Sequence, residues 1–105
     1  MTEIKIPFRE DMAELITVGR KKCTTRTEKY GDVGDTFPVK WKNITTNLVL
    51  THVEKKSLSF VAQFLHDPEG FENATDFVDI WNEIHPRKGF DPKAVKWVHW
   101  FEMVK

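Results

Sequence analysis

The residues with the clearest chemical potential lie in one basic, hydroxyl-rich run between positions 20 and 29. Cationic and hydroxyl donors side by side suit an anion or a carbonyl oxygen, such as a phosphate or the polar edge of a nucleobase. If the segment is extended, Lys21 and Thr25 share one face of the strand, and Thr24 and Arg26 share the other. The alternative is a solvated edge strand whose lysines discourage aggregation. The basic members are Arg20, Lys21, Lys22, Arg26 and Lys29.

The histidines and the single cysteine do not predict a metal site or a cysteine nucleophile. No pair of them has ligand spacing, and neither Cys-x-x-Cys nor His-Glu-x-x-His occurs. His52 and His99 each interrupt an apolar strand, which favours hydrogen-bonded core histidines. Cys23 has no histidine near it in sequence to act as a base, so we interpret it as a small core residue. The glycines at 31 and 34 are typical of turns and form no phosphate-binding loop. We therefore expect no metal and no cofactor.

The composition indicates one folded domain without net charge. The chain has 105 residues, of which 40% are hydrophobic and 12% aromatic, and this length suits one core. Sixteen basic residues balance sixteen acidic ones, so any contact with RNA must be local. No segment approaches the roughly 20 apolar residues that span a bilayer, and residues 1–7 lack the features of a secretion signal. We expect a single cytoplasmic domain over residues 1–105 with no membrane partner.

Hydrophobic periodicity divides the chain between strands and helices. Alternating or continuous apolar runs predict strands at residues 2–6, 22–27, 37–41, 48–53 and 95–104. Helical spacing predicts helices at residues 8–16, 57–65 and 73–84. Ser57 and Asn73 are suitable caps for the last two, and Asp67-Pro68-Glu69-Gly70 indicates a break between them. We expect most of the aromatic residues Trp81, Trp97, Trp100 and Phe101 in the core, although exposed ones could stack on unpaired bases.

Several motifs, in their order and spacing, resemble the ASCH domain family, which is related to the PUA fold. Residues 16–26 read Ile-Thr-Val-Gly-Arg-Lys-Lys-Cys-Thr-Thr-Arg, and residues 30–37 read Tyr-Gly-Asp-Val-Gly-Asp-Thr-Phe. Gly70-Phe71-Glu72, His85-Pro86 and the final strand near residues 97–101 look like the later parts of that family. The resemblance implies an α+β fold: a PUA-like open β-barrel with a mixed sheet, flanking helices and a cleft beside the Gly-x-Lys turn.

The resemblance also implies a role in RNA or nucleotide chemistry. Most members are implied to bind RNA, and some small bacterial members are amidohydrolases that remove the acetyl group from N4-acetylcytidine. Their proton-accepting lysine, nucleophilic threonine and proton-donating glutamate match Lys21, Thr24 and Glu72. An acid ahead of a helix N-terminus, as Glu72 is, is also favoured electrostatically without catalysis. The basic neighbours would bind the substrate: Arg20, Lys22 and Arg26.

Three functional hypotheses follow from these features. The leading hypothesis is an ASCH-domain protein whose cleft binds RNA or a modified nucleoside, with amide hydrolysis of the N4-acetylcytidine type as its reaction. The second is an RNA-binding module without catalysis, in which Arg87 and Lys88 join the basic run in contacting phosphates. The third is a small-molecule or protein-interaction domain with an unrelated basic edge. The insertion at residues 85–92 departs from the short amidohydrolases and leaves the substrate open.

Overall fold

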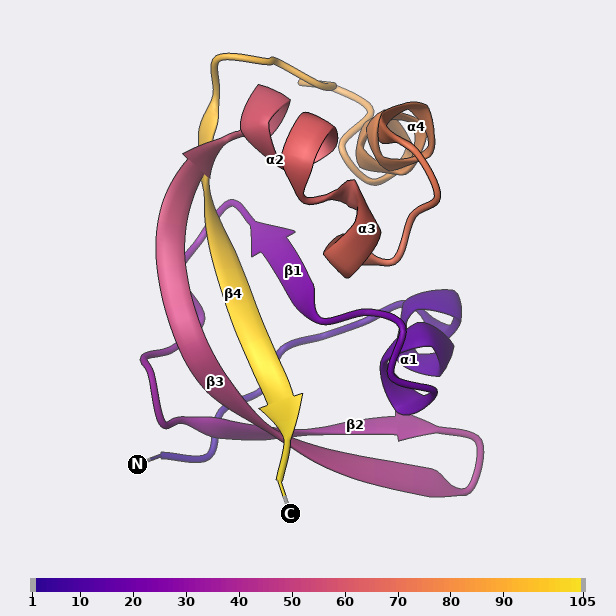
Figure 1. Cartoon of the computed structure of the whole chain (residues 1–105), viewed down its shortest axis with the longest axis vertical. Helices are drawn as coiled ribbons and strands as arrows, with labels where there is room; N and C mark the ends of the chain where they lie inside the picture. Colours follow the sequence, from indigo (N-terminus) through magenta and orange to yellow (C-terminus); the bar gives the residue numbers. More distant parts are fainter. Residues whose placement is uncertain (1, 105) are drawn as a thin grey trace.

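The protein is built on a curled antiparallel sheet that forms half of a barrel (Figure 1). The computed structural model describes residues 2–104, and within them the strands are β1 (Cys23–Arg26), β2 (Thr36–Trp41), β3 (Ile44–Ser57) and β4 (Val95–Met103). Their spatial order is β1-β4-β3-β2, which makes β1 an edge strand. The long strand β3 pairs with β2 through its first half and with β4 through its second half. The sheet therefore curls along β3.

The helices cover two separate parts of this sheet. They are α1 (Glu10–Thr17), α2 (Leu58–Phe64), α3 (His66–Glu69) and α4 (Ala74–Ile84). In Figure 1, α2, α3 and α4 lie together at one end, α1 lies beside β2, and β1 runs between the two groups. No helix within residues 2–104 is long and apolar enough to cross a membrane. The arrangement leaves the edge strand β1 facing the space between the two groups of helices.

Each group of helices closes its own hydrophobic core against the sheet. One core joins α1 to the sheet through buried residues that include Ile16, Phe37, Leu48, Leu50 and Phe101. The other joins α2 and α4 to the sheet through buried residues that include Cys23, Leu58, Val61, Phe77, Trp81 and Val98. Cys23 is thus a core residue, as predicted. The described residues thus form two cores, because both faces of the sheet are covered.

Caps fix the helices that surround β1. Ser57 Oγ accepts a hydrogen bond from the backbone N–H of Phe60 at 3.2 Å, and Asn73 Oδ1 accepts one from Asp76 at 2.8 Å, which confirms both predicted caps. Helix α3 ends at Gly70, whose φ of 106° lies in the left-handed region. The backbone N–H of Gly70 bonds back to Asp67, so the chain reverses directly after Glu69.

Three predicted elements differ from the structure. The strand predicted at residues 48–53 is longer and extends over Ile44–Ser57. Residues 2–6 form no strand, because their pairing is confined to one parallel bridge between Glu3 and Thr36, and the predicted mixed character of the sheet is limited to that bridge. The segment predicted as a break forms the four-residue helix α3. Pro68 is tolerated there because it lies in the first turn, where no intrahelical partner is needed for an N–H.

The predicted core aromatic and histidine residues divide into buried and exposed members. His99 is fully buried, but the His52 side chain is 60% exposed. A register shift between Leu50 and His52 places these two residues opposite neighbouring residues of β4, hence on opposite faces of the sheet. Trp81 is buried, whereas the other three tryptophans are half-buried. Of the four aromatic residues expected mostly in the core, Trp81 and Phe101 are buried, whereas Trp97 and Trp100 are half-buried.

The substitution Gly70→Ala should lower the free energy of unfolding by about 2 kcal/mol. An added Cβ would lie 3.0 Å from Leu15 Cδ1, in addition to the strain at a φ of 106°. Gly19→Ala is the matched control, because its φ is 80° but no atom lies within 4 Å of the added Cβ. The control should lose about 1 kcal/mol. Urea unfolding measures both variants, and equal losses would show that the contact with Leu15 has no cost.

Candidate functional site

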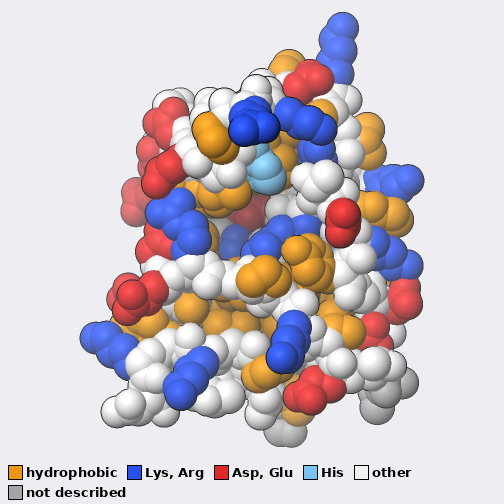
Figure 2. Space-filling model, turned by 180° about the vertical axis from the view of Figure 1, so that it is seen from behind, with side chains coloured by type: hydrophobic (Ala, Val, Ile, Leu, Met, Phe, Trp, Pro, Cys, Tyr) orange, Lys and Arg blue, Asp and Glu red, His pale blue; other side chains and the backbone are white. Residues whose placement is uncertain are grey.

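A pocket of about 540 Å³ opens beside the free edge of β1, between the two groups of helices. Its size lies within the roughly 300–1,000 Å³ that is usual for small-molecule sites. Figure 2 shows a hollow near the centre of this face, bordered by hydrophobic, basic and histidine side chains. We call four buried polar residues of the lining the floor: Lys21, Thr24, Thr25 and Glu69. Aromatic side chains of the lining form the walls: Phe8, Tyr30, Phe71, Phe77 and Trp81.

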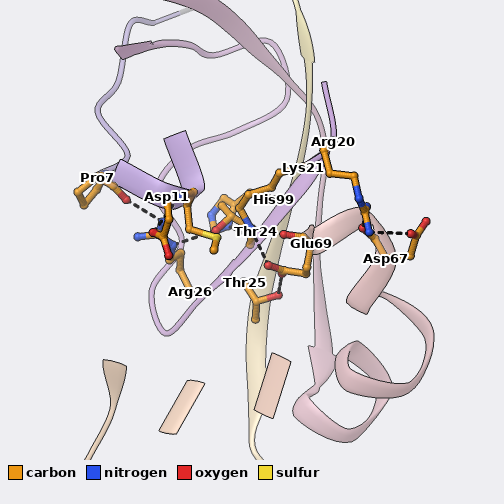
Figure 3. A network of polar contacts seen from close by, with 11 residues as sticks. Pro7, Asp11, Arg20, Lys21, Thr24, Thr25, Arg26, Asp67, Glu69 and His99 are labelled. Atoms are coloured by element: carbon orange, nitrogen blue, oxygen red, sulfur yellow. Dashed lines mark hydrogen bonds and ion pairs between the residues drawn. The ribbon is translucent and has the colours of Figure 1, made fainter. Parts of the chain in front are cut away.

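A buried ion pair between Lys21 and Glu69 organises the floor. Lys21 is 4% exposed and Glu69 is 3% exposed. Lys21 Nζ donates to Glu69 Oε1 and to the Glu69 backbone carbonyl, both at 2.8 Å, while the Thr25 hydroxyl donates to Glu69 Oε2 at 2.5 Å. Figure 3 shows the Glu69 carboxylate between Lys21 and Thr25. Both carboxylate oxygens are therefore hydrogen-bonded, which is what a buried charge requires.

Arg26 lies on the wall of the pocket and bonds to the second threonine of the floor. Its Nε donates to Thr24 Oγ1 at 3.1 Å, and its Nη2 donates to the Pro7 carbonyl at 2.7 Å. The guanidinium carbon lies 4.9 Å from the centre of the Phe8 ring and 5.7 Å from that of Tyr30. Burial lowers the pKa of Arg26, and the nearby Tyr30 and Glu69 oppose this effect. The aromatic rings thus fix a cation close to the Thr24 hydroxyl.

The wall on α4 carries a flat aromatic surface. The rings of Trp81 and His85 lie 4.2 Å apart between centres with an angle of 31° between their planes. Both residues line the pocket. Burial lowers the pKa of His85, and the positive charges of Lys96 and Arg26 lower it further. His85 is therefore neutral near pH 7, and this wall can accept a planar uncharged ring.

The structure brings together only part of the predicted site. Lys21, Thr24 and Arg26 line the pocket, whereas Glu72 and Lys22 are exposed and lie outside the lining. The acid that faces Lys21 is Glu69, not Glu72. The reversal of the chain at Gly70 explains the difference, because it directs Glu69 toward β1 and places Glu72 beyond the turn.

Arg20 contacts α3 and does not line the pocket. Its guanidinium pairs with Asp67 Oδ1 at 3.1 Å, donates to the Asp67 carbonyl, and donates to the Phe71 carbonyl at 3.2 Å. In Figure 3 the Arg20 side chain lies with Asp67, apart from Thr24 and Arg26. Arg20 therefore fastens α3 to the start of β1.

Sequence reasoning missed Glu69 because Asp67-Pro68-Glu69-Gly70 was interpreted only as a helix break. One signal was available, because strand alternation places Thr25 on the same face as Lys21. Both of these side chains bond to Glu69 in the structure. A lysine and a threonine that share a buried face require an acidic partner, but the sequence does not identify which acid supplies it.

Comparisons with known proteins agree on the fold. No family model and no curated protein matches the sequence. A solved ASCH domain from Lactobacillus crispatus JV V101 is 16% identical, with a TM-score of 0.66 over 97% of this chain and 78% of that chain. A DUF984 protein, EF3133 from Enterococcus faecalis V583, is 17% identical, with a TM-score of 0.68 over 98% of this chain and 75% of that chain.

A third solved structure is similar over its whole length. The hypothetical protein PH0355 is 15% identical, with a TM-score of 0.67 over 99% of this chain and 100% of that chain. At these identities the likeness concerns the fold alone. The predicted α+β, PUA-like open barrel with flanking helices is confirmed, and the chain has an ASCH-like fold.

Proposed function

We propose that the protein binds a modified nucleoside in the pocket beside β1 and hydrolyses an amide on its base. The observation that carries this proposal is the Lys21–Glu69 ion pair, buried at the floor of an aromatic-walled pocket. A buried ion pair contributes little net stability compared with apolar residues of similar volume. Its location under a cavity therefore favours a chemical role.

The pocket suits a planar, polar ring. A pyrimidine base could stack against the aromatic wall on α4, where Trp81 and His85 lie. The Arg26 guanidinium bonds to Thr24, to the Pro7 carbonyl and to the Tyr30 side chain, and it lines the pocket. With five N–H donors it could also donate to a carbonyl oxygen of the ligand. These features support a nucleobase bearing a carbonyl substituent as the ligand.

The Lys21–Glu69 pair could supply both a base and an acid. Moving one proton from the Lys21 ammonium to the Glu69 carboxylate removes both charges and leaves a neutral amine beside a protonated acid. The amine then accepts the hydroxyl proton of Thr24 as Thr24 Oγ attacks the amide carbon. The protonated Glu69 donates its proton to the leaving amine as the C–N bond breaks. Water then cleaves the acyl ester, which releases the carboxylic acid and restores the Thr24 hydroxyl.

Hydrogen bonding favours Thr24 over Thr25 as the nucleophile. Thr25 donates its hydroxyl proton to Glu69, so its role in this proposal is to orient the carboxylate. Thr24 accepts from the positively charged Arg26, which leaves its own proton available for transfer. Glu69 takes the acid role that the resemblance implied for Glu72.

A second candidate function is RNA binding without catalysis, which a basic and aromatic surface near the pocket favours. The amino groups of Lys29 and Lys55 lie 5.6 Å and 4.8 Å from the centre of the Trp97 ring. Strand pairing places Trp97 beside Arg26 and Lys55 on one side of the sheet. An RNA strand bound there could also place a base in the pocket. Affinity that falls steeply with salt, without any change in the RNA, would favour this candidate.

Purified protein incubated with N4-acetylcytidine should release cytidine and acetate. The variants Thr24→Ala and Glu69→Gln should each lower kcat/KM by at least about 100-fold, because each removes a group that transfers a proton or forms a bond. Glu72→Gln is the matched control and should keep kcat/KM within about twofold, since Glu72 is exposed outside the pocket. Chromatography of the released cytidine measures the rate.

The opposite results have defined meanings. If the wild-type protein shows no turnover at high enzyme concentration, N4-acetylcytidine is excluded as its substrate. RNA binding without catalysis is then the favoured function. A loss in Glu72→Gln equal to that in Glu69→Gln would contradict the assignment of the acid.

Removal of one partner of the buried pair should destabilise the fold. Lys21→Met should lower the free energy of unfolding by about 3–5 kcal/mol at pH 7, because the Glu69 carboxylate loses its cation in a buried site. Lys22→Met changes the exposed neighbour and should stay within about 0.5 kcal/mol of wild type. The double variant Lys21→Met/Glu69→Leu should recover most of the loss. Urea unfolding measures all three, and a loss below about 1 kcal/mol in Lys21→Met would show that Glu69 readily reaches water or a proton.

A further inference from the structure

His99 is a buried polar residue that the proposed reaction does not use. It lies on β4, opposite Thr24 of β1 in the strand pairing, and its side chain has no exposed surface. Its Nε2 lies 3.0 Å from the backbone N–H of Tyr30, and its Nδ1 lies 3.4 Å from the Thr24 carbonyl oxygen. The ring thus connects a threonine of the floor to the loop that carries a wall of the pocket.

The chemistry of its two neighbours fixes the protonation state of the His99 ring. A backbone N–H can only donate, so Nε2 must accept and carries no proton. The Thr24 carbonyl can only accept, so the ring proton lies on Nδ1. Both contacts are satisfied together by one neutral tautomer. If the ring took up another proton, Nε2 would become a donor facing the Tyr30 N–H donor. The hydrogen bond between them would then be lost.

The contact between His99 and Tyr30 determines where one wall stands. The Tyr30 ring packs edge-on against His99 with centres 6.0 Å apart, and it also lies 5.7 Å from the Arg26 guanidinium. Arg26 in turn donates to the Thr24 hydroxyl. Displacement of Tyr30 would therefore loosen both the wall and the cation that touches the proposed nucleophile.

We propose that neutral His99 is a positioning residue that holds Tyr30 in place relative to β1, so that acid conditions open the pocket and weaken ligand binding. The ligand part of this inference rests on the proposed function, whereas the contact between His99 and Tyr30 does not. His99 touches no reacting atom in the proposed mechanism and acts through its two neighbours.

Burial outweighs the opposing groups around His99 and favours its neutral form. Burial lowers the pKa of His99 and Arg26 lowers it further, while its bonds to the Thr24 and Trp97 backbone and the charge of Glu69 raise it. The net direction is below the usual value of 6.5. A depressed histidine pKa means that the closed arrangement is fully present above pH 6.5 and is lost as the pH falls further. His85 also lines the pocket with a lowered pKa, so its titration must be separated experimentally.

The variant His99→Gln tests the proposal directly. A glutamine carbonyl can accept from the Tyr30 N–H at the place of Nε2, but it cannot take up a proton between pH 5 and 8. His99→Leu removes the acceptor altogether, and His85→Gln removes the other titrating ring of the pocket. Thermal unfolding identifies which variants are folded before any binding is measured.

Two measurements are made on each folded variant between pH 7.5 and 5.5. The first is hydrogen exchange of the Tyr30 amide by NMR, with the ¹⁵N shifts of the His99 ring, and it requires no ligand. The second is the Kd for cytidine, the product of the proposed reaction. Wild type and His85→Gln should show Tyr30 protection and cytidine affinity falling together by at least about threefold over this range, because protonation of His99 removes the acceptor for the Tyr30 N–H.

The two His99 variants show whether His99 acts through its hydrogen bond to Tyr30 or only by filling space in the core. His99→Gln should hold its Kd within about threefold of wild type at pH 7.5 and show little change on acidification, whereas His99→Leu should bind about tenfold more weakly at pH 7.5. An acid response in His99→Gln as large as in wild type, or ring shifts that place a proton on Nε2 at pH 7.5, would overturn the proposal. If no variant binds cytidine, this part of the proposed function fails, and Tyr30 exchange still decides the role of His99.

Discussion

The contact on which the rest of the structure depends is the buried ion pair between Lys21 and Glu69. It joins the edge strand β1 to the short helix α3, with both side chains almost fully removed from solvent. An edge strand presents unpaired backbone groups that must be covered or hydrated. Here α3 covers the start of the strand, and the backbone N–H of Lys22 donates to the Pro68 carbonyl. Charge pairing and backbone bonding thus act at the same junction.

Several local features exist to keep that junction in place. Arg20 bonds to α3 from outside, and Gly70 ends the helix in a conformation that other residues adopt only with strain. Helix α3 has four residues, so its position depends on these tertiary contacts more than on helix propensity. The pocket lies where the covering of β1 stops, beyond Lys21, and its polar floor is the continuation of the same junction. The contacts that hold α3 against β1 therefore also position the polar floor of the pocket.

Periodicity and capping predicted most of the fold because these are local properties. The caps at Ser57 and Asn73 and the strand at Cys23–Arg26 follow from neighbouring residues, and each is present. The exposure of His52 could not be predicted, because it depends on a register shift between distant strands. Glu69 was missed for a similar reason: its role is set by Lys21, which is 48 positions away in the chain.

The basic run illustrates how one sequence feature can contain two structural roles. Within this run Lys22 is exposed to solvent, whereas Lys21 and Arg26 line the pocket. Strand alternation does not separate these roles, because Lys22 and Arg26 share one face of an extended segment and Lys21 lies on the other. A count of charges along the sequence could not distinguish these roles.

The charges inside the pocket bear on what it can stabilise, independently of the fold that it shares with ASCH-domain structures. Lys21 and Glu69 compensate each other, and the neutral His85 and His99 add no charge near pH 7. Arg26 places a positive charge next to the Thr24 hydroxyl. In the proposed reaction, a fixed cation at that point would favour negative charge as it develops on an oxygen of the carbon under attack. The proposed acyl transfer would use this charge in its transition state more than in its neutral ground state, whereas simple binding of a neutral base would not need it.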